Sequence, residues 1–167
     1  MQWAVLGTGD RALEKELQQM SRENAGRIGV VIDFSEPLAH RIEAGADLFL
    51  MPSAYEPCGL NQLYSLKYGT LPVVHQTGGL ADTVVGADVE SLAARAATGF
   101  SFDTYDRVAL AKALEQAITL YNDRPDLWKQ MIETAMQQDW SWRASAARYS
   151  VLYAQTIARH HTTALTT

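Results

Sequence analysis

The chain has 167 residues, a length typical of one domain, and 47% of them are hydrophobic while 20% are charged. This composition excludes a disordered protein, and a net charge of −5 without any run of Lys or Arg argues against nucleic-acid binding. No apolar stretch reaches the roughly 18 residues of a membrane span, no signal-peptide pattern opens the chain, and the single cysteine, Cys58, favours a reducing, cytoplasmic setting.

Short apolar runs alternate with helical patterns through the first half of the chain. Strands are predicted, in chain order, at residues 3–6, 28–32, 47–51, 71–75 and 99–102. Asp10 is positioned to cap a helix that ends near Gly26, and residues 35–37 are expected to begin the next helix with Pro37 in its first turn. This alternation predicts an α/β fold, with a Rossmann-like parallel sheet and helices on both of its faces.

The second half of the chain is predicted to be mainly helical. An amphipathic stripe covers residues 110–121, a second helix follows at 126–136, and Ser141 is positioned to cap a last one. We interpret the aromatic side chains of this last segment as core residues, namely Trp140, Trp142, Tyr149 and Tyr153. Residues 160–167 are rich in Thr and are expected to form a disordered tail.

Residues 52–62 contain the strongest indication of chemistry. They join the third predicted strand to a helix, at the edge where open α/β sheets bind ligands. Pro57 is expected to begin that helix, and Gly59 lets the backbone amides of residues 58–60 approach a ligand closely. Amides at the positive end of a helix suit a phosphate or sugar hydroxyls, and Glu56 offers a carboxylate to the same ligand. The alternative is an ordinary turn with a solvated Glu56.

A second glycine turn follows the predicted strand at 71–75. Residues 77–83 place Gly78 and Gly79 where free backbone amides are again expected at the edge of the sheet. A Gly-Gly pair alone is more typical of a tight loop. Two consecutive strands that both end in glycine turns at one edge nevertheless favour a shared phosphate or sugar site.

Cysteine and histidine permit a different chemistry. Cys58 at a helix N-terminus is a candidate nucleophile of a Cys–His hydrolase, with His40 or His75 as its base. We favour the competing interpretation, in which residue 58 contributes only its backbone amide. On the residue pattern alone, His40 is interpreted as structural and His75 as a surface residue.

Several longer motifs are specific enough to compare with known families. The main ones are ADLFLMPS at residues 46–53, YEPCGL at 55–60, QLY at 62–64, LKYGTLP at 66–72 and TGGLADTV at 77–84. Shorter ones are GTGD at 7–10, HRI at 40–42, ATGF at 97–100 and WSW at 140–142. Together they resemble bacterial glycogen (starch) synthases over nearly the whole chain.

The resemblance implies a glycosyltransferase of the GT-B type, in which two Rossmann-like halves enclose the active site. Residues 1–159 would be the C-terminal, nucleotide-sugar-binding half without its first strand–loop–helix unit, which bears an Arg and a Lys that grip the diphosphate. Residues 142–159 would be a terminal helix that crosses to the absent N-terminal domain. The implied reaction transfers glucose from ADP-glucose to the non-reducing end of an α-1,4-glucan with retention, and it needs no metal and no cofactor.

The resemblance also implies roles for single residues. Glu56 would be catalytic and would bind the donor glucose, together with the backbone amides of Cys58 and Gly59. The nucleotide would lie against a second group, in which Phe34 stacks on adenine; this group comprises Phe34, Leu60, Asn61 and Tyr64. The cleft itself would include His40, Gly78 and Gly79.

Two positions depart from the family pattern, and other interpretations stay open. Asn61 stands where Thr is common and Phe34 where Tyr is common, so one hydroxyl contact is missing at each position. The residues do not decide between ADP-glucose and UDP-glucose. The alternative function is a non-catalytic nucleotide-binding or interaction module built on the same half-domain fold.

Overall fold

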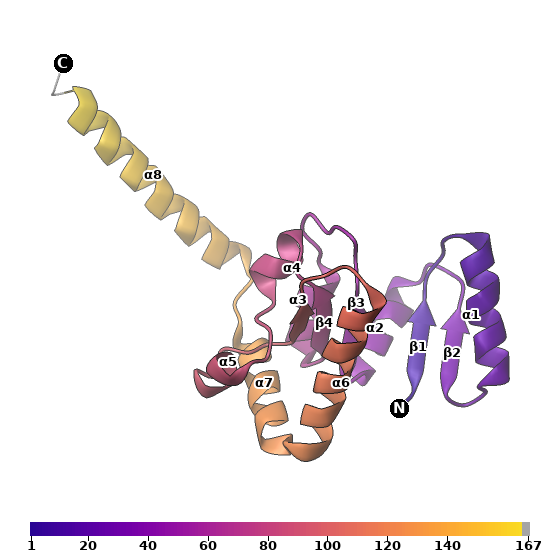
Figure 1. Ribbon diagram of the computed structural model, residues 1–167. Coiled ribbons are helices and arrows are strands. Elements are labelled where there is room, and N and C mark those ends of the chain that lie inside the picture. Colours follow the sequence, from indigo (N-terminus) through magenta and orange to yellow (C-terminus); the bar gives the residue numbers. More distant parts are fainter. Residues whose placement is uncertain (165–167) are drawn as a thin grey trace. The chain divides into compact units, whose positions relative to one another are not determined.

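The computed structural model describes the backbone of residues 1–164 and the side chains of residues 1–159 (Figure 1). The chain forms two compact units, of which the first covers residues 1–136 and the second begins at Gln137. Every strand pairing in the described chain is parallel, and helices separate successive strands up to β5. The predicted parallel α/β fold is therefore confirmed.

The first two strands form a small sheet of their own. Strand β1 (Trp3–Leu6) pairs with β2 (Ile28–Val31), and helix α1 (Arg11–Glu23) connects them. The side chain of Asp10 accepts hydrogen bonds from the first-turn amides of α1, so the predicted N-cap is confirmed. The predicted single sheet is thus divided, because this pair does not join the strands that follow.

A second sheet contains the remaining strands in the order β3-β4-β5. These are β3 (Leu48–Met51), β4 (Leu71–His75) and β5 (Phe100–Phe102). Helix α2 (Glu36–Gly45) precedes β3, and α3 (Asn61–Tyr68) connects β3 with β4. The two short helices α4 (Gly78–Thr83) and α5 (Val89–Ala93) lie between β4 and β5.

The hydrophobic core of the first unit is built around this second sheet. All five residues of β4 are buried. Helices α6 (Arg107–Asp123) and α7 (Pro125–Gln137) pack Ala113, Ala117 and Met131 into the same cluster as Phe100. The carboxyl ends of β3 and β4 are therefore held by a well-packed core.

The second unit contains helix α8 (Trp142–Ala164), which Ser141 caps through a 3.3 Å hydrogen bond from the Ala144 amide. The prediction that the aromatic residues of this last segment are core residues is wrong. Trp142 is 90% exposed, and the others, Trp140, Tyr149 and Tyr153, are at least 40% exposed. The predicted tail at 160–167 overlaps the end of α8, and its last three residues lie outside the described part. In the described residues, no helix is long and apolar enough to cross a membrane.

Candidate functional site

Two loops meet at the carboxyl ends of β3 and β4. The Gly79 amide donates a 2.9 Å hydrogen bond to the Glu56 carbonyl, which joins the loop after β4 to the loop after β3. A Cβ atom on Gly78 would collide with the Glu56 carbonyl oxygen, and one on Gly79 would collide with the Cys58 carbonyl. Only glycine allows this backbone-to-backbone contact. The structure therefore brings the two glycine turns together, whereas the prediction of a free Gly79 amide is wrong.

Several donors fix the carbonyl groups of the loop at residues 52–60. The side-chain amide of Gln62 donates to the Cys58 carbonyl and to the Gly59 carbonyl, each at 3.0 Å. His75 Nδ1 lies 2.9 Å from the Ser53 carbonyl. With the bond to Glu56 from the neighbouring loop, several carbonyl groups of this loop are thus bonded by the protein itself.

The amide side of the same loop is unoccupied. Helix α3 begins at Asn61 and has no side-chain cap at Leu60. In residues 1–164, no protein acceptor is bonded to the amides of residues 58–60. Leu60 is the N-cap of α3, and free N–H groups at and just before the partly positive start of a helix can bind an anion or sugar hydroxyls.

The helix does not begin at Pro57, so that prediction is wrong. Gly59 has φ +68°, a left-handed conformation that cannot continue a right-handed helix. The turn through Pro57 and Cys58 therefore precedes the helix instead of forming its first turn, and α3 starts two residues after Gly59.

The Glu56 side chain is partly buried within this loop. The Ser53 hydroxyl donates a hydrogen bond of 3.4 Å to Glu56 Oε2. The carboxylate therefore has a local donor, and it is attached to the same loop as the unoccupied amides. A ligand bound by those amides would find a carboxylate acceptor in the same loop, which suits the hydroxyls of a sugar.

The predicted nucleotide-binding residues are exposed side chains. Leu60, Asn61 and Tyr64 lie at the start of α3, and Leu60 and Tyr64 are 55% and 41% exposed. Phe34 lies between β2 and α2 and is 88% exposed. Among the described residues, no ring contact joins Phe34 to Tyr64. An exposed aromatic face of this kind can stack on a planar ring.

His40 is brought next to this group. Its Nδ1 lies 3.2 Å from the Tyr68 hydroxyl, and its ring centroid is 5.3 Å from that of Tyr64. These contacts join α2 to α3. The interpretation of His40 as structural therefore has a contact to support it, and its neighbour Tyr64 is one of the predicted site residues.

The two histidines do not serve Cys58 as a base. His75 is buried, with 8% of its surface exposed, so its interpretation as a surface residue is wrong. Its ring nitrogens face the Ser53 carbonyl and the Asp103 carbonyl, and His40 faces the α3 tyrosines. Cys58 is exposed, and no described interaction joins it to either histidine. The arrangement needed for a Cys–His nucleophile is not formed.

No role was predicted from the sequence for three residues that contact this loop, or residues bonded to it, in the structure. Ser53 and Gln62 contact the loop directly, and Thr83 donates to the Gly79 carbonyl at 2.6 Å while accepting from Gln62 at 3.2 Å. Gln62 is separated from Cys58 by one helical turn, a spacing that could have indicated the contact. The contacts of Thr83 depend on α4 lying against α3, which no local pattern shows.

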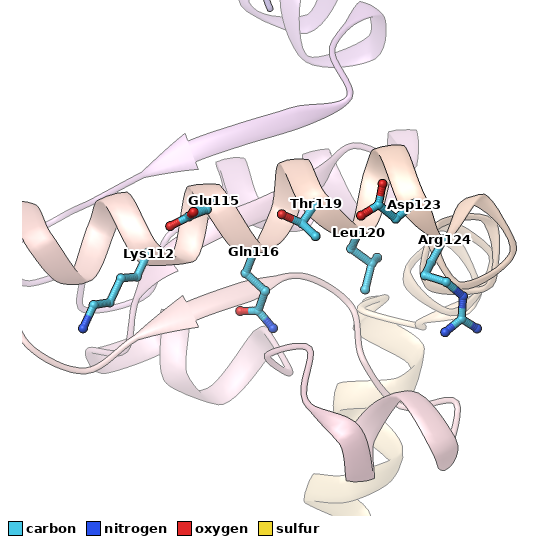
Figure 2. A pocket seen from close by; sticks show the side chains of 7 residues that line it. All are labelled: Lys112, Glu115, Gln116, Thr119, Leu120, Asp123 and Arg124. Atoms are coloured by element: carbon cyan, nitrogen blue, oxygen red, sulfur yellow. The ribbon is translucent and has the colours of Figure 1, made fainter.

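A groove elsewhere on the first unit does not overlap this site. It has a volume of about 530 Å³ and is lined by side chains of α6 and by Arg124, which follows that helix (Figure 2). Gln116 there donates to the Ala87 carbonyl, and Arg124 pairs with Asp126 at 2.8 Å. These polar groups are already engaged. The described residues also contain no His, Cys, Asp and Glu cluster that could hold a metal ion.

Comparison with known proteins finds relatives over nearly the whole chain. The chain is 51% identical over 157 residues to a glycogen synthase of Rhodopirellula baltica and 54% identical over 152 residues to one of Thioalkalivibrio sulfidiphilus. These matches cover 94% and 91% of the chain but only 31% of each relative, so the chain spans about a third of their length.

A solved structure and a family description extend this comparison. The catalytic domain of starch synthase IV from Arabidopsis thaliana, bound to ADP and acarbose, superposes with a TM-score of 0.81 and 31% identity. The superposition covers 94% of this chain and 32% of that one. Residues 2–138 match the family described as "Glycosyl transferases group 1". This chain therefore belongs to the group 1 glycosyltransferases.

Proposed function

We propose that this chain is the donor-binding half of a glycogen synthase. The complete enzyme would transfer glucose from ADP-glucose to the non-reducing end of an α-1,4-glucan, with retention at the anomeric carbon. The observation that carries this proposal is the loop of residues 52–60, which bears both the unoccupied amides and the Glu56 carboxylate. The glycogen synthases among its relatives support the choice of reaction.

The glucose of the donor would occupy the space beside Glu56. Its hydroxyls would donate to the carboxylate and accept from the amides of Cys58 and Gly59. A carboxylate near the reacting carbon stabilises the positive charge that builds there as the nucleotide departs, more than it stabilises the neutral ground state. Glu56 would thus act on the rate of the chemical step.

The nucleotide would extend from this sugar along the start of α3. The amides near Leu60 and Asn61 lie at the positive end of the helix and would bind the diphosphate. Phe34 offers an exposed ring for the adenine, and the choice of ADP as the nucleotide is supported by the Arabidopsis relative, which is bound to ADP. Charge on the leaving ADP would be stabilised by amides and basic side chains, with no metal involved.

The acceptor glucan and the rest of the active site would come from an N-terminal domain. The exposed aromatic face of α8, including Trp142, Tyr149 and Tyr153, is the surface we assign to that domain. The matched relatives are about three times longer than the matched region, which leaves room for such a domain.

The proposal is tested with the complete enzyme and with this chain alone. In the complete enzyme, Glu56→Ala is expected to lower kcat roughly a hundredfold or more, by analogy with the loss of one preorganised electrostatic contact. Its effect on the KM for ADP-glucose should be much smaller. Cys58→Ser is the matched control, because we assign only the backbone amide of Cys58 to the site. Loss of activity in Cys58→Ser with little change in Glu56→Ala would overturn the assignment.

The chain alone is expected to make no glucan, since one wall of the site cannot position both reactants. It should bind ADP or ADP-glucose with a Kd on the order of a millimolar, because the basic residues that neutralise the diphosphate lie elsewhere. Calorimetric titration measures this value. Binding in the micromolar range would place the phosphate contacts within this chain, and ADP-glucose-dependent glucan synthesis would make the second domain unnecessary.

A further inference from the structure

His75 at the end of β4 is a buried polar side chain that the proposed mechanism does not use. Its imidazole is 8% exposed and packs against Phe102 and Tyr105, with ring centroids 5.5 and 5.2 Å away. Nδ1 lies 2.9 Å from the Ser53 carbonyl, and Nε2 lies 3.3 Å from the Asp103 carbonyl. A buried ring with two polar atoms is costly unless those atoms are bonded.

The chemistry of these contacts decides which ring nitrogen carries a proton. A carbonyl oxygen only accepts hydrogen bonds, so the ring must donate to it. The shorter contact, at Nδ1, therefore requires a proton on Nδ1. In the described chain this is the hydrogen bond that the Ser53 carbonyl receives.

Ser53 transmits this contact to the site. Its carbonyl is bound by His75, and its hydroxyl donates to Glu56 Oε2 at 3.4 Å. The backbone position of Ser53 thus sets where its hydroxyl lies, and the hydroxyl in turn orients the carboxylate. A side chain in a loop stays in one place when neighbouring hydrogen bonds hold its supports.

We infer that His75 is a positioning residue that holds the Glu56 carboxylate through Ser53. The inference rests on the proposed function for its effect on catalysis, and on the geometry alone for the contact itself. Because positioning acts on the transition state more than on ground-state binding, its loss should appear in kcat and not in the KM for ADP-glucose.

The kinetic test compares two substitutions that each place an amide donor at the position of one ring nitrogen. In His75→Asn the side-chain amide replaces Nδ1 and can still donate to Ser53, whereas in His75→Gln it replaces Nε2 and reaches toward Asp103. Both variants lose the same aromatic packing. In the complete enzyme we expect His75→Gln to lower kcat on the order of tenfold, with His75→Asn close to wild type. Thermal unfolding of both variants separates this effect on kcat from a general loss of stability.

A double-mutant cycle with Ser53→Ala tests the path from His75 to Glu56. Ser53→Ala keeps the carbonyl but removes the hydroxyl, so it should lower kcat as much as His75→Gln does. If the two residues act in series, the double variant loses no more activity than either single variant. Equal kcat values for His75→Asn and His75→Gln, or additive losses in the cycle, would overturn the inference.

Nitrogen NMR of the His75 ring tests the contact independently of any activity. We expect a protonated Nδ1 in the 167-residue chain and loss of that signal pattern in His75→Gln. An unprotonated Nδ1 would refute the anchor even in an active enzyme. A wild-type enzyme without glucan synthesis would instead refute the proposed function and leave a protonated Nδ1 in place.

Discussion

The two sheets of the first unit differ in how well they are buried, although both are parallel and both are connected by helices. Every residue of β4 is buried, whereas β1, β2 and α1 contain no buried residue at all. The loop that bears Glu56 leaves the well-buried sheet, and Phe34 follows the less buried one. The proposed sugar-binding side of the site therefore has a rigid support, and the proposed adenine-binding side has a weaker one.

The largest effect is expected when the same Leu side-chain atoms are removed from each sheet. Leu71 on β4 is fully buried and belongs to the main core, while Leu6 on β1 is only partly buried. Leu71→Ala is expected to cost about 2–5 kcal/mol of unfolding free energy, since it leaves a cavity in a packed core. Leu6→Ala should cost about 1 kcal/mol or less, in proportion to the smaller apolar area that it removes. Urea denaturation of both variants measures the two values, and equal losses would contradict the comparison.

A second test replaces one glycine after β4 and one glycine after β1 by alanine. Gly79→Ala would force a Cβ into the Cys58 carbonyl, where backbone and not a flexible side chain must move. We expect a loss of about 1–3 kcal/mol, as is usual for overpacking, and weaker ADP-glucose binding because the loop after β3 is displaced. Gly9→Ala is the matched control, because nothing lies within 4 Å of a Cβ at that position. A Gly79→Ala variant as stable as Gly9→Ala would show that the two loops are not in contact.

These contrasts show how far the sequence could lead. The strands were placed within one residue of their bounds, and the caps at Asp10 and Ser141 and the helix start after Ser35 were found, because each depends on neighbours in the chain. The loop between β3 and α3 was predicted for the same reason, because a strand, a Gly and a helix follow one another, while its role as a binding site stays a prediction.

What could not be predicted depends on contacts between distant segments. His75 is buried because Phe102 and Tyr105 pack on it, and these lie more than twenty residues away. The bond from Gly79 to the Glu56 carbonyl likewise joins two loops that local patterns treat separately. The exposure of Trp142 has a related origin, since an apolar stripe predicts an amphipathic helix but not the surface that covers it.

A third test uses the buried carboxyl group of Glu43 on α2, the helix that follows β2 and precedes β3 in the sequence. Glu43 is 4% exposed and Oε2 has no hydrogen-bond partner among the described residues. Burial raises the pKa of Glu43 above its ordinary value, and the nearby His40 and Ser65 lower it by less. A folded-state pKa above the unfolded one favours the folded protein at low pH, and this contribution is lost as the pH rises through the folded-state pKa.

Glu43→Gln should therefore leave stability nearly unchanged at pH 4 and raise it at pH 8, relative to the wild type. Thermal unfolding at the two pH values measures the difference. Glu115→Gln, at an exposed position on α6, is the control and should not change the pH dependence. A Glu43→Gln variant that is less stable than wild type at pH 8 would show that the buried carboxylate is favourably paired in the folded protein.

The smallest effect is expected from Asp10→Ala, which removes the N-cap of α1. Asp10 Oδ1 accepts from the Ala12 amide at 2.8 Å and from the Leu13 amide at 3.2 Å. Loss of a cap costs about 1 kcal/mol locally. Because α1 contributes no buried residue, this loss should open α1 and β1 while the core around β4 stays folded. Hydrogen exchange should then become faster at the amides of α1 and remain unchanged at those of β4, with the urea midpoint of the core unaltered. Equal acceleration in both places would mean that the two sheets unfold as one unit, and that the adenine-binding side is as firmly supported as the sugar-binding side.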